Sequence, residues 1–214
     1  MVEPLTLLAA ATAATGLWAA YRMRCRAIRA ESRLAGLAGQ LEAARHAANH
    51  DSLTGLYNRR GFHQRGEVLL TDRTQFPILA IVVDLDAFKQ VNDAFGHAAG
   101  DRVLTTIGRR LTHFVGDGAV ARLGGDEFAA LMGNVPVDPG SRDQARKRLA
   151  SQLGAPIEIG GEAVRIHASI GLAPVTGPTR LAEALALADT DMYRTKSLTS
   201  AASLPLDNAS IAEV

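Results

Sequence analysis

The sequence predicts an α+β domain in which helices cover an antiparallel sheet, preceded by a long helical segment. A continuous apolar, β-branched run at residues 76–83 is typical of a strand buried on both faces. Two more apolar runs, residues 118–121 and 129–132, flank Gly124 and Gly125. Paired glycines accept the positive φ of a tight hairpin turn, so this segment predicts two strands joined by a hairpin. Strand and helix patterns follow one another in mixed order, which favours the α+β class.

The other elements follow from apolar spacing and turn residues. Gly96 ends a short helix whose apolar face holds Phe88, Val91 and Phe95, and this face is expected to be buried in the core. Gly100 opens the next helix. Helices are expected at residues 59–70, 100–114, 141–153 and 181–196, the last with Tyr193 on its buried side; a hairpin is expected at residues 156–166 and a central strand at residues 167–173.

Composition narrows the function classes. At 214 residues the chain has room for one ordinary domain and an appendage. The net charge of +1 does not indicate a nucleic-acid surface, so no nucleic-acid partner is expected. The single Cys25 excludes an intrachain disulfide and a zinc site built from cysteines.

The first segment, residues 1–21, is interpreted as a membrane anchor. Residues 5–21 carry no charge but are slightly short of the ~20 residues that cross a bilayer. Arginines follow this run rather than precede it, which argues against a secretory signal peptide and places the rest of the chain in the cytoplasm. A single-pass protein of the cytoplasmic membrane is therefore expected. The alternatives are an Ala-rich soluble helix and a mis-assigned start codon.

Residues 22–50 are expected to form a helical linker. Apolar residues recur at alternating spacings of three and four, which is the pattern of a coiled-coil seam. The seam consists of Ala27, Ala30, Leu34, Leu37, Leu41, Ala44 and Ala48. The linker is interpreted as a parallel dimer stalk. The alternative is a lone amphipathic helix lying on its own domain.

Two acidic clusters carry the functional prediction. Asp84-Leu85-Asp86 ends the buried strand, where an acid is costly unless it is paired or bound to a cation. Such oxygen ligands suit Mg²⁺, which usually takes one or two carboxylates. Asp126 and Glu127 follow the paired glycines, and neighbours on a strand point to opposite faces. Alone, these segments are also compatible with a capped strand end and a polar hairpin tip.

Asn92 and Asp101 add a possible base-reading pair. An amide offers both a donor and an acceptor, and a carboxylate accepts two N–H groups such as those of guanine N1 and N2.

Four segments together resemble the GGDEF family of diguanylate cyclases. They are the signature at residues 124–128, the opening motif at residues 51–60, the acidic segment at residues 84–101 and the helix end at residues 188–196. The resemblance runs from about residue 51 to residue 196. It implies a catalytic domain at residues 51–197 with a cyclase-like palm, related to the ferredoxin-like βαβ arrangement, and a disordered tail at residues 198–214.

The resemblance also implies a reaction and its site. Two GTP molecules condense to cyclic di-GMP with release of pyrophosphate, each held by one subunit of a homodimer. The implied metal ligands, for Mg²⁺ or Mn²⁺, are Asp84, the Leu85 carbonyl and Asp126. The implied substrate-binding residues are Asn92 and Asp101 for guanine, and Lys89, His97, Gly124, Gly125 and Lys196 for the phosphates or the nucleotide. Glu127 or Asp126 assists deprotonation, and the sequence leaves that choice open. For His97 a helix-end cap is the alternative.

Two positions depart from the family pattern, and a third, Asp51, is expected to form an ion pair. Gly118 stands where many members have the Asp of an inhibitory Arg-x-x-Asp site, so product inhibition by that route is expected to be absent. Ser200 stands where the family has an Arg near the phosphates, which leaves a catalytically weak or inactive binding module as the alternative function. Asp51 is expected to pair with Arg59 or Arg60.

Overall fold

A computed structural model describes residues 4–202, which fall into two units divided between Ala47 and Ala48. The first unit consists of most of helix α1 (Pro4–Asn49), in which Arg22 stacks over the Trp18 ring at 4.7 Å from its centroid. The seam leucines Leu34, Leu37 and Leu41 are exposed on this helix. No helix within residues 4–202 is long and apolar enough to cross a membrane, so the predicted anchor remains a prediction from the sequence.

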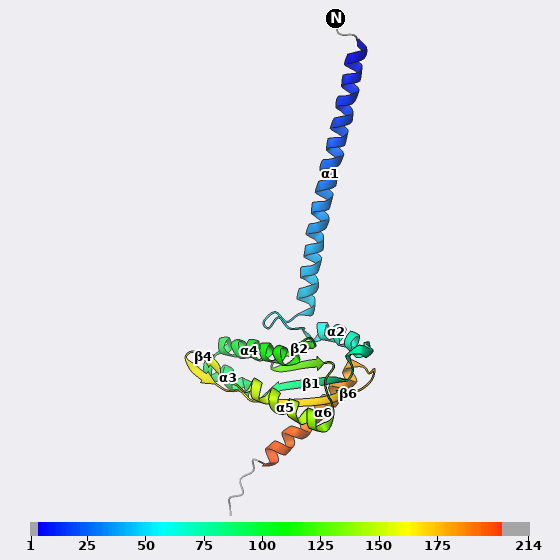
Figure 1. Cartoon of the computed structure of the whole chain (residues 1–214). Coiled ribbons are helices and arrows are strands. Elements are labelled where there is room, and N and C mark those ends of the chain that lie inside the picture. Colours follow the sequence, from blue (N-terminus) through cyan, green and yellow to red (C-terminus); the bar gives the residue numbers. More distant parts are fainter. Residues whose placement is uncertain (1–3, 203–214) are drawn as a thin grey trace, which may run out of the picture. The chain divides into compact units, whose positions relative to one another are not determined.

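The second unit is a four-stranded antiparallel sheet with helices on both faces (Figure 1). The strand order is β2-β3-β1-β6, and each neighbouring pair is antiparallel. Its elements are α2 (Arg59–Thr71), a 3₁₀ turn (Arg73–Gln75), β1 (Ile78–Leu85), α3 (Phe88–Phe95), α4 (His97–Val115), β2 (Ala119–Gly124), β3 (Glu127–Met132), α5 (Pro139–Leu153), the separate hairpin β4 (Ile157–Ile159) and β5 (Glu162–Val164), β6 (Ala168–Val175) and α6 (Leu181–Ala202). The predicted α+β class and antiparallel sheet are confirmed.

The sheet separates two apolar cores, which explains why the β1 segment reads as a continuous apolar run. Leu79, Ile81 and Val83 of β1 belong to the core that includes α4 and α5. Ile78, Ala80 and Val82 belong to the core that includes α2 and α6. Because strand side chains alternate between faces, burial on both sides requires an apolar residue at every position.

The segment predicted as a central strand is instead the edge strand β6, which pairs only with β1. Its apolar residues are buried on both faces, Ile170 and Leu172 in the core of α4 and α5, and Ala173 and Val175 in the core of α2 and α6. Helix α6 packs so closely that a Cβ built on Gly171 would lie 2.0 Å from the main-chain oxygen of Ala188. Burial by a helix therefore produced the same sequence pattern as burial between two strands.

Other predictions about the start of α4 and about the burial of two aromatic side chains were wrong. Helix α4 begins at His97 rather than at Gly100, because Gly96, with φ of 82°, already separates the two helices. Phe95 and Tyr193 are 42% and 76% exposed rather than buried. Phe95 is the last residue of a two-turn helix, and the neighbouring half-buried Met192 takes the inner position on α6. Helix α6 continues to Ala202, and the rest of the predicted tail lies outside the described residues.

Candidate active site

The two acidic clusters meet at the end of β1. In the register of β1 and β3, Asp84 lies directly opposite Glu127. Both follow the alternation that places Val82 and Ala129 in the core beside α2 and α6, so their carboxylates share that face. Asp126 occupies the hairpin turn, and its carbonyl accepts a hydrogen bond from the Leu85 N–H at 3.4 Å. The main chains of the two clusters therefore run side by side.

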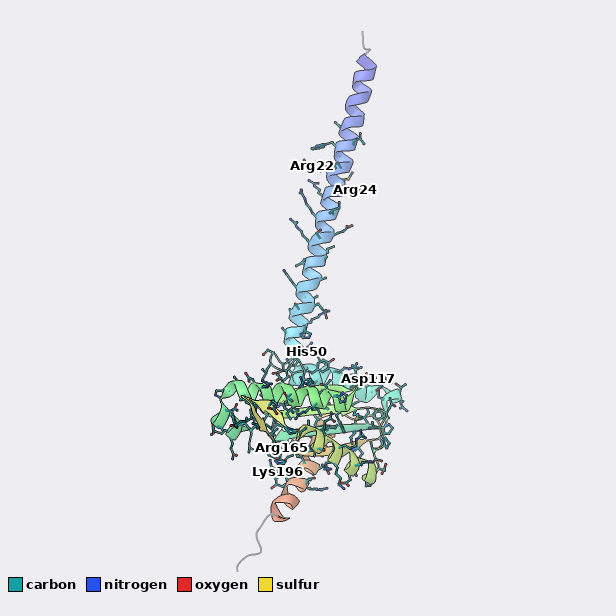
Figure 2. The ribbon with its side chains drawn as sticks, turned by 60° about the vertical axis from the view of Figure 1, so that its left-hand side comes forward. Arg22, Arg24, His50, Asp117, Arg165 and Lys196 are labelled. Atoms are coloured by element: carbon teal, nitrogen blue, oxygen red, sulfur yellow. The ribbon has the colours of Figure 1, made fainter. Side chains whose placement is uncertain are left out.

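One cationic side chain from α2 and one from α6 lie close to this acidic pair. Like charges directly opposite each other across a ladder are destabilising. Lys196 lies on α6 (Figure 2). Its ammonium lies 3.1 Å from Asp84 Oδ2 and 3.6 Å from Asp86 Oδ1. An Arg59 guanidinium nitrogen of α2 lies 3.8 Å from Glu127 Oε2. The hydrogen bond to Asp84 and the charges of both aspartates raise the pKa of Lys196.

A cavity of about 660 Å³ opens beside the acidic pair, between α2 and α6. Asp84 and Glu127 contribute to its wall from the sheet, Arg59 and His63 from α2, and Asp189 from α6. Burial raises the pKa of the Asp189 carboxyl. The site thus combines carboxylates with a partly open cleft, and clefts that hold a few polar groups are the usual form of a small-molecule site.

A hairpin with special backbone geometry carries the signature. Gly124 and Gly125 have φ of 152° and 53°, values that L side chains rarely adopt, and the β2–β3 register shifts between Arg122 and Gly124. The Arg122 guanidinium donates to the carbonyl of Gly125 at 2.9 and 2.8 Å and to both carboxylate oxygens of Asp51 at 3.3 Å. Arg122 therefore ties the turn to the opening motif.

The expected pairing of Asp51 with Arg59 or Arg60 was wrong. Arg59 forms an ion pair with Glu127 instead, and Asp51 pairs with Arg122. The Arg122 side chain is 15% exposed and the Asp51 side chain is 22% exposed. Burial by itself would raise the pKa of Asp51, but hydrogen bonds from Thr54 and the charge of Arg122 bring that pKa below its ordinary value. The available signal was that Arg122 is the lone basic residue of an otherwise apolar strand.

The predicted guanine readers lie where α3 meets α4. Asn92 is half-buried on α3, and Asp101 is exposed in the first turns of α4. A Cβ built on Gly100 would lie 2.0 Å from Asn92 Oδ1, so this glycine leaves the space that the Asn92 amide occupies. Helix α4 packs on the sheet face opposite to the acidic pair. Among the described residues, Lys89 and His97 are exposed, and neither they nor Asp126 line the cavity between α2 and α6.

The donor set fits a hard divalent ion. No group of three His, Cys, Asp or Glu side chains in residues 4–202 is placed to hold a metal. Mg²⁺ usually takes only one or two carboxylates and completes its shell with water and substrate phosphates. Asp84 and Glu127 lie opposite each other, and the Lys196 ammonium already places a positive charge against Asp84. The residues present therefore suit a cation bound together with a phosphate ligand.

The structure gives a steric reason for a glycine at position 118, where many members of the family have the inhibitory aspartate. A Cβ built there would lie 2.1 Å from the Leu131 carbonyl oxygen and 2.6 Å from a Val115 methyl group. A side chain at this position would require the main chain of β3 to move.

Fold and site together define a palm-like α+β domain with an acidic centre at a glycine hairpin. A family model described as "Diguanylate cyclase, GGDEF domain" matches residues 48–200, so the chain belongs to the GGDEF domain family.

The chain is also similar to several curated proteins. An uncharacterized 19.3 kDa protein of Streptomyces ambofaciens is 36% identical over 162 residues, which cover 74% of this chain and 84% of the relative. MucR of Pseudomonas aeruginosa, a bifunctional diguanylate cyclase/cyclic di-GMP phosphodiesterase, is 37% identical over 179 residues, which cover 78% of this chain and 25% of MucR. An uncharacterized protein of Mycobacterium tuberculosis is 41% identical over 136 residues, which are 62% of this chain and only 21% of that protein.

Solved structures share the fold. A sensory box/GGDEF family protein from Caulobacter crescentus has a TM-score of 0.61 at 35% identity, with 70% of this chain and 99% of that chain covered. The coiled coil and GGDEF domain of DgcB from Caulobacter crescentus, in complex with c-di-GMP, has a TM-score of 0.71 at 22% identity, with 82% of this chain and 94% of that chain covered. The second likeness concerns the fold alone.

Proposed function

We propose that this chain is a diguanylate cyclase that joins two GTP molecules into cyclic di-GMP and releases pyrophosphate. The observation that carries the proposal is the register of β1 and β3, which places Asp84 directly opposite Glu127 beside Lys196. An intact signature at residues 124–128 accompanies this geometry.

The carboxylates have distinct proposed roles. Asp84, the Leu85 carbonyl and Asp126 would hold Mg²⁺ or Mn²⁺, which would offset charge on the triphosphate and lower the pKa of the attacking hydroxyl. Glu127 lies opposite Asp84 with 56% of its side chain exposed, and this geometry supports our proposal that Glu127 accepts the proton of that hydroxyl. Asp126 remains the alternative base.

The remaining proposed contacts bind the nucleotide. Asn92 and Asp101 would read guanine, and Lys196 would bind the phosphates once they displace it from Asp84. Lys89 and His97 are exposed on α3 and α4 and would lie near the nucleotide. Gly124 and Gly125 carry no side chain, so the phosphates can approach the hairpin backbone.

Condensation requires two bound substrates, so we propose that a homodimer is the active form. The 3′-hydroxyl oxygen of one GTP bonds to the α-phosphorus of the other, the bond to pyrophosphate breaks, and the hydroxyl proton passes to the base. The same step occurs again in the opposite sense to close the ring. The exposed Leu34, Leu37 and Leu41 of α1 are the surface that would join two copies.

A GTP-binding module without turnover is the second candidate. It is favoured by Ser200, since the lost charge-assisted hydrogen bond to phosphate is worth about 1.5–3 kcal/mol.

Incubating the purified full chain with GTP and Mg²⁺, and detecting products by mass spectrometry, separates the two candidates. We expect cyclic di-GMP from the natural chain and none from Asp84→Asn or Glu127→Gln. Asp143→Asn is the matched control, because Asp143 is an exposed carboxylate paired with Lys147 on α5. Bound GTP without product would favour the module. Equal product from Asp84→Asn would refute the assignment of the site.

A further inference from the structure

The outer edge of β6 is occupied by side chains rather than by another strand. An unpaired edge exposes main-chain groups that require partners. The Ile170 carbonyl accepts a hydrogen bond from the Arg146 guanidinium of α5. The Leu172 N–H donates to Asp191 Oδ2 of α6 at 2.7 Å. The Ile170 carbonyl and the Leu172 N–H, which are separated by Gly171, thus each bind a side chain from a different helix.

The same two side chains form an ion pair. Arg146 Nη2 lies 2.7 Å from Asp191 Oδ2, with only 20% and 29% of the side chains exposed. Partly buried pairs are screened less by solvent than exposed ones, and removing one partner leaves the other charge uncompensated. Arg146 and Asp191 therefore join α5, β6 and α6 at one point.

This point precedes Lys196 by little more than one turn of α6. Within residues 181–196 of this helix, the last fully buried residue is Ala188, Met192 is half-buried and Tyr193 is exposed, so core packing decreases toward Lys196. Asp191 lies between Ala188 and Lys196, and its carboxylate attaches this part of α6 to Arg146 of α5 and to the main chain of β6.

The segment of β6 that forms a hydrogen bond to α6 also forms one to the acidic cluster at the end of β1. Ser169 Oγ donates to Asp86 Oδ1 at 2.8 Å, and Asp86 Oδ1 lies 3.6 Å from the Lys196 ammonium. A cavity of about 640 Å³ lies among Arg146, Ser169, Asp86 and Lys196. The edge of β6 therefore contacts both the ammonium-bearing helix and one of the carboxylates that the ammonium meets.

We propose that Arg146 and Asp191 are positioning residues that set the reach of Lys196 toward the triphosphate of the substrate. The proposal rests on the proposed function, in which Lys196 binds phosphate. Loosening α6 at Asp191 would let the last turns move, and the ammonium would no longer be held within hydrogen-bonding distance of the acidic centre. Binding of the phosphates would suffer, whereas recognition of guanine on α3 and α4 would not.

Two substitutions isolate the ion pair. Asp191→Asn keeps an oxygen for the Leu172 N–H and removes the charge. Arg146→Met keeps most of the apolar stem and removes the guanidinium. Arg146→Lys keeps the charge but loses the fork that serves Asp191 and Ile170 together, so an intermediate effect is expected. Lys147→Met is the matched control, since Lys147 is the next residue of α5 and is 76% exposed.

The experiment measures the affinity of the full chain for a non-hydrolysable GTP analogue with Mg²⁺ and for GMP, by calorimetry. We expect Asp191→Asn and Arg146→Met each to weaken binding of the GTP analogue about tenfold, which corresponds to about 1.4 kcal/mol, and to leave GMP binding unchanged. In a Lys196→Met background the same substitutions should have little further effect, because coupled residues are not additive.

Equal losses for GMP and the GTP analogue, or additive losses in the Lys196→Met background, would overturn the proposal in favour of a purely structural role. If Arg146→Met does not fold, Asp191→Asn and Arg146→Lys carry the same comparison. A natural chain that binds neither ligand refutes the proposed function, and the inference with it. A natural chain that binds both, with variants that show no difference, refutes the inference alone.

Discussion

Gly100→Ala is expected to weaken guanine recognition without unfolding the domain. The added Cβ would lie 2.0 Å from Asn92 Oδ1 and 3.1 Å from Phe88 Cζ. Carbon–oxygen contacts are ordinarily no shorter than about 3.3 Å, so the Asn92 amide must retreat by about 1.3 Å. A displacement of that size takes a hydrogen bond of ordinary length beyond the range in which it counts.

The magnitude follows from the loss of one neutral hydrogen bond. A contribution of about 0.5–1.5 kcal/mol corresponds to a roughly 2- to 13-fold weaker affinity for GTP. The preference for GTP over ATP should fall by the same factor, because contacts to the triphosphate remain. Helix propensity opposes any loss of stability, since alanine is favoured over glycine by roughly 0.5–1 kcal/mol in a helix.

Calorimetric titration of GTP and ATP into the full chain measures both quantities. Gly177→Ala is the matched control, because a Cβ there would meet nothing within 4 Å. Unchanged discrimination between GTP and ATP in Gly100→Ala would refute the assignment of Asn92 as a base reader. Equal weakening of both nucleotides would show a general distortion instead.

Three further predictions concern stability and assembly. Gly118→Ala should lower the free energy of unfolding by about 1–3 kcal/mol in urea titration, because its Cβ would lie 2.1 Å from the Leu131 carbonyl; an unchanged midpoint would contradict this. Asp51→Asn should destabilise the domain near neutral pH. The folded-state pKa of Asp51 is lowered, so its stabilisation is present above the unfolded-state pKa and is lost as the pH falls through the folded-state value. Urea titrations at neutral and strongly acidic pH should therefore show a deficit that shrinks in acid, and a constant deficit would refute the linkage. Leu37→Asp should shift the chain toward monomer in analytical ultracentrifugation, because Leu37 is 61% exposed on α1 and lies in the predicted seam; an unchanged mass would argue against the stalk.

The elements of the domain were predictable because their signals are local. The helix expected at residues 59–70 is α2 at Arg59–Thr71, and the strand and hairpin around Gly124 formed as expected. Phe95 shows the limit of such signals, since apolar spacing does not reveal that the core ends one turn earlier.

The polar contacts that connect the elements were not predictable in the same way. Arg122 meets Asp51 across 71 residues, and Arg146 meets Asp191 across 45. Arg122 stands out only as the lone basic residue of an apolar strand, which does not name its partner, and nothing in the local spacing distinguishes Arg146 from arginines on a solvated surface. The predicted helix at residues 141–153 is rich in basic residues, and Arg146 shows that one of these charges is half-buried against an edge strand.

The two halves of the candidate site lie on different faces of one sheet, and this constrains how a nucleotide can bind. Asp84 and Glu127 face the side covered by α2 and α6, whereas Asn92 belongs to the helix pair on the side of α4. A single ligand that contacts both must pass over the end of β1 rather than along either face.

The groups at that end are the main chain of Leu85 and the Gly124–Gly125 turn, which carries no side chain. The φ values of the two glycines close the hairpin. In the proposed function the glycines have a second, independent role, because their missing side chains leave a path between base and phosphates. Substitution of either glycine should thus reduce nucleotide binding even where the hairpin still forms, which distinguishes a binding role from a purely conformational one.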